Sequence, residues 1–329
     1  MTKVYVFNDF GGPEQQQMID RPLPQPAAGQ LTIEVRAAGV NPADWKIREG
    51  QLGRKWPLPA PMGREAAGVV TAIGEGVEGF AVGDEVLGAV ASGHGGLAEH
   101  TILDAANTVA KPEEISWADA ATLPVAGATA YDVTHQIELE PGQILLIIGA
   151  GGGVGRMAAQ IGAVHEFRVL GIAGADKRET VEATGAEFIE AGSGIADRVR
   201  AIAPDGVDLI VDLVGGEALH AVGGTVKDPS RIITTADPET ARQLGGASVE
   251  RTGEALDKIT DVVKYEVVDP HVTGRFNLDD AGKALAAVEA GHTEGKSHRR
   301  TLNQPFSSSA AGSEPRGCAD HEIHMALSA

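Results

Sequence analysis

Two patterns of hydrophobic and polar residues divide the chain. In its first third, short stretches that predict strands fall at residues 3–7, 31–37, 67–73 and 84–90, with glycines and prolines between them. Alternation with a period of two is typical of strands that bury one face, and strands this closely spaced favour a compact barrel. We therefore predict a β-rich domain over residues 1–120.

From residue 121 onward, apolar runs alternate with amphipathic stretches. Runs bounded by turn residues predict buried strands, and apolar residues at helical spacing predict helices. The predicted strands span 144–149, 168–173, 187–190, 207–214, 231–235 and 247–250, and the predicted helices span 154–164, 177–184, 195–203, 256–263 and 279–290. This order predicts an α/β fold over residues 121–255, with a doubly wound parallel sheet that binds a dinucleotide.

The most informative stretch is ILLIIGAGGGVG, at residues 144–155, where an apolar strand ends in glycines before a predicted helix. Glycines let backbone N–H groups approach a pyrophosphate, and the helix N-terminus adds partial positive charge. The spacing departs from a strict GxGxxG because Ala150 stands at the first glycine position. The alternative is a turn that only lets strand and helix pack closely. The residues predicted to contact the cofactor here are Gly149, Ala150, Gly152, Gly153, Val154 and Gly155.

The sequence changes character after Lys296. The remaining residues are mostly polar, rich in serine and without hydrophobic periodicity. Such a composition is typical of segments that bury too little apolar surface to fold. We predict a disordered tail over residues 297–329, and we expect removal of residues 301–329 to leave melting temperature and activity unchanged.

Composition narrows the classes of partner and location. The chain has 329 residues, a formal net charge of −19 and one cysteine, Cys318. Nucleic acids and anionic membranes select basic surfaces, so neither is an expected partner. One cysteine forms no disulfide within the chain, no apolar run approaches the ~20 residues of a membrane span, and the N-terminus lacks a signal-peptide core. We therefore expect a cytoplasmic protein.

Several stretches together resemble the medium-chain dehydrogenase/reductase superfamily, and within it the zinc-free quinone oxidoreductases (ζ-crystallin-like). The likeness lies in AAGVNPADWKIREG (37–50), GREAAGVVTAIGEGVEGFAVGDEVLG (63–88), GGLAEH (95–100), LPVAGATAYDV (123–133), VDLIVDLVGG (207–216), GRFNLDDAGKALAAVEAGHTEGK (274–296) and the glycine loop. The resemblance implies a GroES-like β-barrel domain at 1–120, a Rossmann domain at 121–255, and a return segment at 256–296 that completes the first domain. It also implies a homodimer. Relatives continue after Gly295-Lys296 with a final apolar strand, which we expect to be missing or replaced here.

The resemblance also bears on the chemistry. Zinc-dependent relatives carry a cysteine and a histidine where this chain has Asn41 and Arg64, and a single cysteine cannot supply a Cys₄ site. The implied reaction is metal-free delivery of a hydride from a reduced nicotinamide to a quinone. One alternative is an enoyl reductase that acts on an α,β-unsaturated carbonyl, with a biosynthetic pathway as its setting. Another is a non-catalytic regulator that binds NADPH.

Two residues match positions of the family's catalytic cleft. Asn41 could donate a hydrogen bond to a substrate carbonyl, or its amide could satisfy the turn before Pro42. Thr129 matches a threonine that faces the nicotinamide, and its alternative role is a hydroxyl bonded back to its own helical turn. No general acid is evident, so the proton is expected to come from solvent.

The cofactor is predicted to be NADPH, with NADH as the alternative. The second strand of the dinucleotide fold ends at Ala173 without the acidic residue that binds the ribose hydroxyls of NAD. Lys177 and Arg178 follow and could bind a 2′-phosphate, whereas Asp176 could itself bind the ribose. The resemblance adds Val214, at the end of the fourth strand, to the predicted cofactor contacts.

Overall fold

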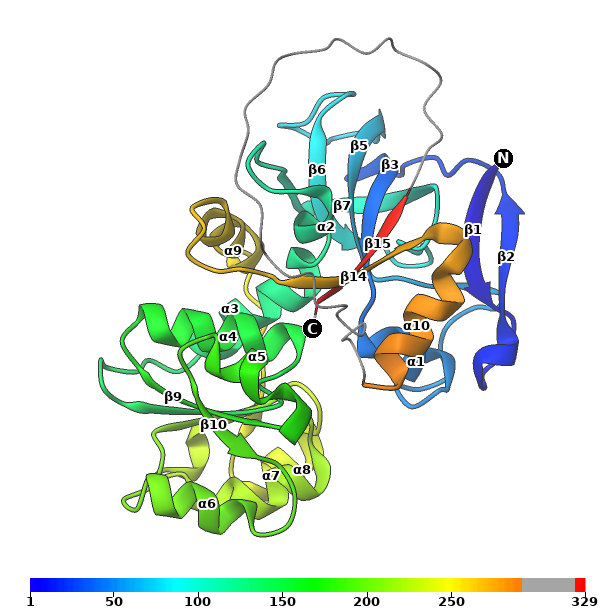
Figure 1. Ribbon diagram of the computed structural model, residues 1–329. Helices are drawn as coiled ribbons and strands as arrows, with labels where there is room; N and C mark the ends of the chain where they lie inside the picture. Colours follow the sequence, from blue (N-terminus) through cyan, green and yellow to red (C-terminus); the bar gives the residue numbers. More distant parts are fainter. Residues whose placement is uncertain (292–322, 329) are drawn as a thin grey trace, which may run out of the picture.

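The structure, a computed structural model, describes residues 1–291 and 323–328 and shows two lobes (Figure 1). One lobe is built mainly of antiparallel strands and the other of a parallel sheet between helices. The predicted disorder of residues 297–322 and 329 falls outside the described residues. No described helix has the length and apolar character needed to cross a membrane.

The first lobe is a GroES-like barrel. Its larger sheet has the order β14-β15-β3-β5-β6-β7, and β3 also pairs with β7, which closes the barrel. Its smaller sheet has the order β2-β1-β4. The elements from the first part of the chain are β1 (Thr2–Phe7), β2 (Gln16–Arg21), β3 (Gln30–Gly39), α1 (Pro42–Arg48), β4 (Ala60–Pro61), β5 (Glu65–Ile73), β6 (Glu85–Val90), β7 (His100–Ala110) and α2 (Trp117–Ala120). The predicted strands at 3–7, 31–37, 67–73 and 84–90 all lie within this set, whereas β2, β7 and α1 were not predicted.

The second lobe is a Rossmann domain with six parallel strands in the order β10-β9-β8-β11-β12-β13. This is the order that places a dinucleotide where the winding of the sheet reverses, beside β8. The strands are β8 (Ile144–Ile148), β9 (Arg168–Ala173), β10 (Glu187–Glu190), β11 (Leu209–Asp212), β12 (Ile232–Thr234) and β13 (Ala247–Ser248). The helices are α3 (Ala128–His135), α4 (Gly153–Val164), α5 (Arg178–Glu182), α6 (Ile195–Ile202), α7 (Gly216–Val222) and α8 (Pro238–Leu244).

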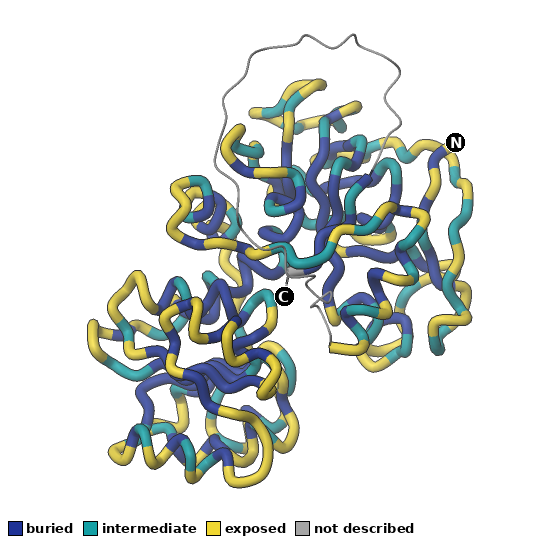
Figure 2. The backbone as a smooth tube through the Cα atoms, viewed as in Figure 1, coloured by how far each residue is buried: buried dark blue, intermediate teal, exposed yellow. Residues whose placement is uncertain are grey.

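Burial explains why this sheet has unbroken apolar strands. Along β8, Leu145 and Ile147 pack with α3, α4 and α5, while Leu146 and Ile148 pack with α6, α7 and α8. Because both faces are covered, the strands are buried on both sides and show no polar alternation (Figure 2). The glycine loop therefore follows the carboxyl end of β8, a strand that is buried inside the sheet.

The chain then returns to the first lobe. Helix α9 (Ala255–Lys264) packs on the Rossmann lobe through Ile259, and β14 (Val272–Asn277) and α10 (Ala281–Glu289) lie against the barrel. Arg48 of α1 is fully buried and bonds to Glu289 of α10 at 3.1 Å. This ion pair joins the N-terminal part of the chain to the return segment, and Glu49, 3.3 Å away, is a second carboxylate partner of the buried Arg48.

The C-terminal residues 323–328 correct the expectation of a disordered tail. His324–Ser328 forms β15, which pairs antiparallel with β14 and parallel with β3 in the middle of the larger sheet (Figure 1). Ile323, Met325 and Leu327 are buried. The expectation was wrong here because composition averaged over the whole tail concealed a short alternating apolar run at its end. The final strand that seemed missing is supplied from beyond residue 322.

We expect Leu327→Ala to lower the free energy of unfolding by about 2 kcal/mol, because it removes buried methyl groups from an interior strand. The same change at exposed Leu52 should have little effect. Thermal unfolding of both variants and of the wild type measures this. Equal melting temperatures for Leu327→Ala and the wild type would show that β15 adds no stability, as first expected for the tail.

Candidate active site

A cavity of about 400 Å³ lies at the carboxyl ends of β8, β9 and β11 and reaches the barrel at the end of β3. It brings together most of the residues predicted to contact a cofactor, namely Gly149, Gly152, Gly153, Val154, Gly155, Ala173, Lys177 and Val214. From the barrel, Val40, Asn41 and Pro42 complete the lining. Ala150 is fully buried beneath the loop and Arg178 lies outside the lining, so these two predicted contacts are not in the cavity.

The glycine loop is shaped by close backbone approaches. Gly149 has a φ of +89°, and a Cβ atom there would come within 2.9 Å of Val214. At Gly155 a Cβ would collide with the carbonyl oxygen of Gly149, so only glycine lets α4 start directly against β8. The loop therefore aims the first amides of α4, a helix of 12 residues capped by Gly152, at the cavity. A glycine cradle at a helix N-terminus suits a pyrophosphate, so these residues fit a dinucleotide.

The two basic residues after β9 point in different directions. Lys177 is buried and its side chain packs over Gly151 in the cavity wall. The guanidinium of Arg178 instead stacks on Phe188 at 4.2 Å and pairs with Glu182 at 3.1 Å. The prediction of a basic pair at the cofactor is therefore wrong for Arg178. Helical spacing explains why, since adjacent residues on a helix do not share a face. Asp176 also lies outside the cavity lining.

Asn41 lies between the end of β3 and the start of α1, and both its backbone N–H and its side-chain amide donate hydrogen bonds to nearby carboxyl groups. Its backbone N–H donates to the carboxylate of Asp44 at 2.8 Å, and its side-chain Nδ2 donates to Oε1 of Glu65 at 2.7 Å. Oε2 of Glu65 accepts a further hydrogen bond from the backbone N–H of Val125, at 2.6 Å. Asn41 thus lines the cavity and is held by Glu65, which links the barrel to the start of the Rossmann lobe through Val125. The capping box that Asn41 forms with Asp44 matches the second role considered for it, at the turn before Pro42.

Glu65 is a buried carboxyl that sequence reasoning missed. Burial raises its pKa to about 8, although the hydrogen bonds from Asn41 and Val125 oppose the shift, and nearby Asp44 adds to it. Burial likewise raises the pKa of Asp44 to about 6. The available signal was a glutamate inside the small apolar run REAAGVV, because an acidic residue in a buried strand needs a partner.

Stability should fall as the pH rises from about 6.5 to 8.5. Glu65 has an ordinary pKa of 4.5 and a pKa of about 8 in the folded chain, so the folded state binds more protons in this interval. Its contribution is fully present below 4.5 and is lost as the pH rises through about 8. One such proton changes the free energy of unfolding by at most about 1.4 kcal/mol per pH unit. Burial lowers the pKa values of His94 and His135. These two groups therefore make the folded protein more stable as the pH rises toward their ordinary pKa of 6.5, which lies at the lower end of this interval.

Calorimetry of wild type and Glu65→Gln across this interval isolates the effect. The variant has no titrating group at this position, so its melting temperature should change less with pH even if it is lower throughout. Identical pH slopes for the two proteins would show that the Glu65 carboxyl is ionised in the folded state across the whole interval.

Thr129, the second candidate catalytic residue, is bonded within its own helical turn. Its hydroxyl donates to the carbonyl oxygen of Val125 at 2.5 Å, which is the alternative role considered for it. Its oxygen accepts a hydrogen bond from Nη1 of Arg251, also at 2.5 Å. Arg251 lies 3.7 Å from the buried carboxylate of Asp132 and keeps 55% of its side chain exposed. No sequence signal marked this arginine, which follows β13 in a polar stretch.

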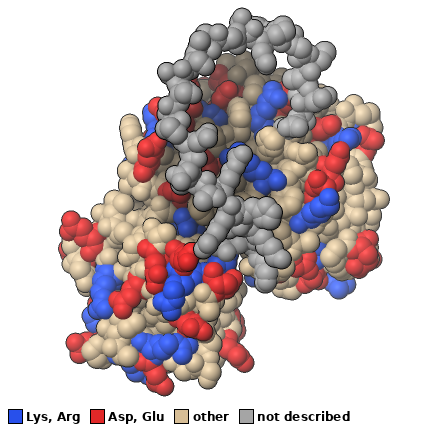
Figure 3. All heavy atoms as spheres, viewed as in Figure 1, with Lys and Arg blue, Asp and Glu red and all other residues tan. Residues whose placement is uncertain are grey.

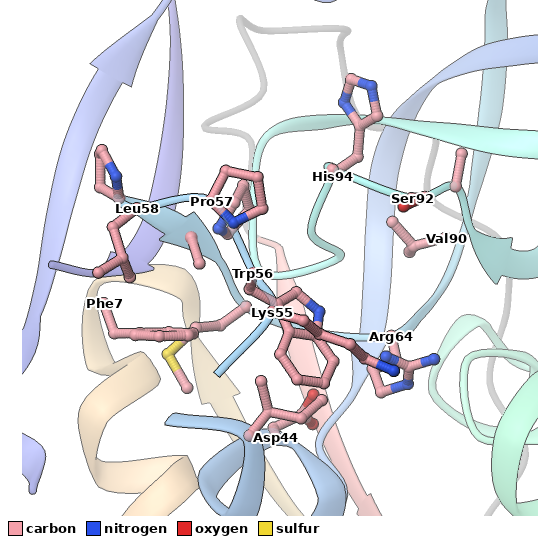
Figure 4. A pocket seen from close by; sticks show the side chains of 18 of the residues that line it. Phe7, Asp44, Lys55, Trp56, Pro57, Leu58, Arg64, Val90, Ser92 and His94 are labelled. Atoms are coloured by element: carbon pink, nitrogen blue, oxygen red, sulfur yellow. The ribbon is translucent and has the colours of Figure 1, made fainter. Parts of the chain in front are cut away.

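A second, larger cavity of about 710 Å³ lies near the start of α1. Its lining is shown in Figure 4. The two are neighbours because Asn41 lines one and its hydrogen-bond partner Asp44 lines the other. The larger cavity has an apolar wall that includes Phe7, Ile47, Trp56, Leu58, Met62 and Val90, and its charged or titratable lining residues are Arg21, Asp44, Lys55, Arg64 and His94. Such a mixture suits a small organic molecule with a polar group.

The described part of the chain contains no group of three His, Cys, Asp or Glu side chains able to hold a metal ion. Zinc-dependent relatives have metal ligands at the positions of Asn41 and Arg64. Here Asn41 has an amide that is bonded to Glu65, and Arg64 has a guanidinium. Neither group is a usual zinc ligand.

Two family models match the chain. The alcohol dehydrogenase GroES-like domain matches residues 27–113, and the zinc-binding dehydrogenase model matches residues 184–297.

Curated relatives come from several organisms. The human synaptic vesicle membrane protein VAT-1 homolog is 34% identical over 240 residues, covering 71% of this chain and 61% of that protein. The quinone oxidoreductase of Rattus norvegicus is 34% identical over 225 residues, covering 67% of this chain and 68% of that protein. The 2-methylene-furan-3-one reductase of Solanum lycopersicum is 29% identical over 309 residues, covering 89% and 78%. The chain spans 57% to 61% of the length of the human, mouse and rat VAT-1 homologs.

Solved structures share the whole two-lobed arrangement. The quinone oxidoreductase from Coxiella burnetii superposes with a TM-score of 0.81 at 27% identity, covering 89% of this chain and 97% of that one. A mycobacterial protein solved in complex with NADPH gives a TM-score of 0.80 at 26% identity, covering 90% and 98%.

Proposed function

The chain belongs to the quinone oxidoreductase branch of the medium-chain dehydrogenase/reductase superfamily, and from this membership we propose that it transfers a hydride from NADPH to a quinone without zinc. The observation that carries the proposal is the pair of adjoining cavities. One is a glycine-lined site suited to a dinucleotide, and the other is an apolar-walled site suited to a small conjugated acceptor. Asn41 lines the first cavity and its hydrogen-bond partner Asp44 lines the second, and in this proposal the acceptor and the nicotinamide approach each other there.

In this proposal the chain's own residues bind and orient the two reactants. The amides at the start of α4 bind the pyrophosphate, and Lys177 binds the 2′-phosphate that distinguishes NADPH from NADH. When bound, the reduced nicotinamide supplies the hydride. Holding the acceptor against the nicotinamide converts a bimolecular reaction into an effectively unimolecular step. This orientation of the two reactants is the main contribution expected of a metal-free site.

Reduction of a quinone by one hydride and one proton gives a hydroquinone, and negative charge develops on an acceptor oxygen on the way. The Thr129 hydroxyl already donates a hydrogen bond to the carbonyl oxygen of Val125, and Thr129 and Arg251 both lie outside the linings of the two cavities, so we assign neither residue to that charge. The proton can come from solvent, as a hydroquinone oxygen is easily protonated near neutral pH.

A second candidate is reduction of an α,β-unsaturated carbonyl. The tomato relative is named a reductase of such a compound, and its alignment covers 89% of this chain. The chemistry differs in where the hydride lands, because an enone accepts it on carbon and then needs a proton on the neighbouring carbon. A non-catalytic NADPH-binding role is the third candidate. The homodimer and the cytoplasmic location stay predictions.

Loss of reduced-nicotinamide absorbance with matched acceptors separates these candidates. Purified protein is mixed with NADPH and a panel of ortho- and para-quinones, and in parallel with enones and enoyl thioesters. The proposal expects turnover with quinones. Turnover with enones alone would replace it by the second candidate, and NADPH binding without turnover on either panel would favour the third. The same panel with NADH tests the cofactor preference.

A further inference from the structure

The charged side chains of the larger cavity are unusual for this protein. The chain as a whole has 46 acidic residues against 27 basic ones, and both signs are interspersed over the face seen in Figure 3. The cavity reverses this balance, since its lining contains three cationic side chains, Arg21, Lys55 and Arg64, and one carboxyl, Asp44. A cationic cavity in an acidic protein concentrates anions locally.

Arg64 and Lys55 carry charges that no neighbour neutralises directly. Both side chains are exposed to the cavity, and neither forms an ion pair with a residue in the described part of the chain. Lys55 lies over the ring of Trp56, 5.1 Å from its centre. Arg21, by contrast, donates to the carbonyl oxygen of Pro59 at 2.7 Å and is held in the wall. Arg64 and Lys55 are therefore the cations available to a ligand.

Asp44 interacts electrostatically with Arg64 and offsets its charge in part, but the lining contains three cationic side chains to this one carboxyl. Asp44 is buried, and its carboxyl accepts hydrogen bonds from the backbone N–H groups of Asn41 and Gly63. His94 is half-buried, and burial together with Arg21 lowers its pKa, so it adds little charge near neutral pH.

The opposite part of the cavity is apolar. Phe7 and Leu58 lie across the cavity from Arg64, and Trp56 lies between them beside Lys55 (Figure 4). A ligand that satisfies both parts has a flat apolar body and an anionic substituent at one end. Carboxylate and sulfonate groups match the geometry of a guanidinium, which donates two parallel hydrogen bonds.

We propose that the acceptor of this enzyme is an anionic conjugated carbonyl compound, whose carboxylate, sulfonate or phosphate group is bound by Arg64 and Lys55 while its ring packs on Trp56 and Phe7. The inference rests on the proposed function, because it names the class of acceptor for that reaction. Arg64 is thereby a specificity-determining residue, and it occupies the position where zinc-dependent relatives have a metal ligand.

The test compares a neutral and an anionic acceptor with the same ring, 1,2-naphthoquinone and its 4-sulfonate. Arg64→Met should lower kcat/KM for the sulfonate at least about tenfold more than for the neutral quinone, since one charge-assisted interaction is lost. Arg54→Met is the matched control, because Arg54 is an exposed arginine nearby that is absent from the cavity lining. It should leave the ratio of the two kcat/KM values unchanged. An equal loss on both acceptors for Arg64→Met would overturn the inference.

A binding measurement separates this inference from the proposed function. Naphthalene-1-sulfonate, which a hydride does not reduce, is titrated calorimetrically into the NADP⁺-saturated protein, with 1-naphthol as the neutral ligand. Weaker binding of the sulfonate to Arg64→Met, with 1-naphthol unchanged, supports the anionic site even if no quinone is turned over. Suppose that the protein turns over the neutral quinone, but that Arg64→Met and the wild type bind the sulfonate with equal affinity. This result would agree with the proposed function and contradict the inference.

Discussion

Replacing Gly152 with valine should weaken NADPH binding at least about 100-fold while leaving the fold intact. Gly152 caps α4 with φ −89° and ψ 169°, a conformation that valine adopts readily. It is exposed and lines the cofactor cavity, so the added side chain would occupy space that a pyrophosphate needs. Several hydrogen bonds to phosphate would be lost together, which explains the size of the effect.

Fluorescence titration with NADPH measures the affinity, and thermal unfolding shows whether the variant is folded. Gly224→Val is the matched control, because Gly224 is also exposed in the Rossmann lobe and a Cβ atom there would meet nothing within 4 Å. It should bind NADPH like the wild type. Undiminished affinity in a folded Gly152→Val variant would mean that the pyrophosphate lies elsewhere.

Lys177→Gln should raise the dissociation constant for NADPH about 10- to 100-fold and change that for NADH little. Among the described residues, Lys177 is the basic side chain that lines the cavity beyond β9, and a charge-assisted hydrogen bond to phosphate contributes about 1.5–3 kcal/mol. NADH lacks the 2′-phosphate, so its binding does not depend on this cation. We expect the variant to lose the preference for NADPH over NADH while it still binds both dinucleotides.

Arg178→Gln is the natural comparison for this variant. Its guanidinium is occupied by Phe188 and Glu182 on the outer side of α5, so the affinity for both cofactors should be unchanged. Isothermal titration of the two variants with both dinucleotides completes the comparison. If Lys177→Gln weakened NADH and NADPH equally, the lysine would support the loop without recognising the phosphate, and the assignment of NADPH would lose its basis.

The Rossmann lobe was the part of the fold most accessible from sequence, for a physical reason. Strands such as β8 are buried on both faces, so they appear as uninterrupted apolar runs between turns, and the glycine loop follows at once. The barrel was harder, because β2 and β7 are partly exposed along much of their length and lack a clean alternation. β15 was missed because its partners, β3 and β14, are remote in sequence.

The candidate site was predicted in outline but not in its contacts. Asn41 and the glycine loop line one cavity, whereas Thr129 lies outside its lining, and hydrogen bonding decides what each side chain can do. Glu65 takes up the amide of Asn41, and Arg251 bonds the hydroxyl of Thr129 from 122 residues away. Contacts between residues remote in sequence depend on the folded geometry, which a linear pattern of residue types does not encode.

The most direct test of the account is a single-turnover reaction in the presence of a strong chelator. Protein treated to remove metal ions is saturated with NADPH and mixed rapidly with 1,2-naphthoquinone, while the absorbance of the reduced nicotinamide is followed. We expect one equivalent of NADPH to be oxidised per site. The rate should be unaffected by the chelator or by added zinc, and the reaction should be lost in Gly152→Val. Oxidation that appears only after zinc is added would contradict the account.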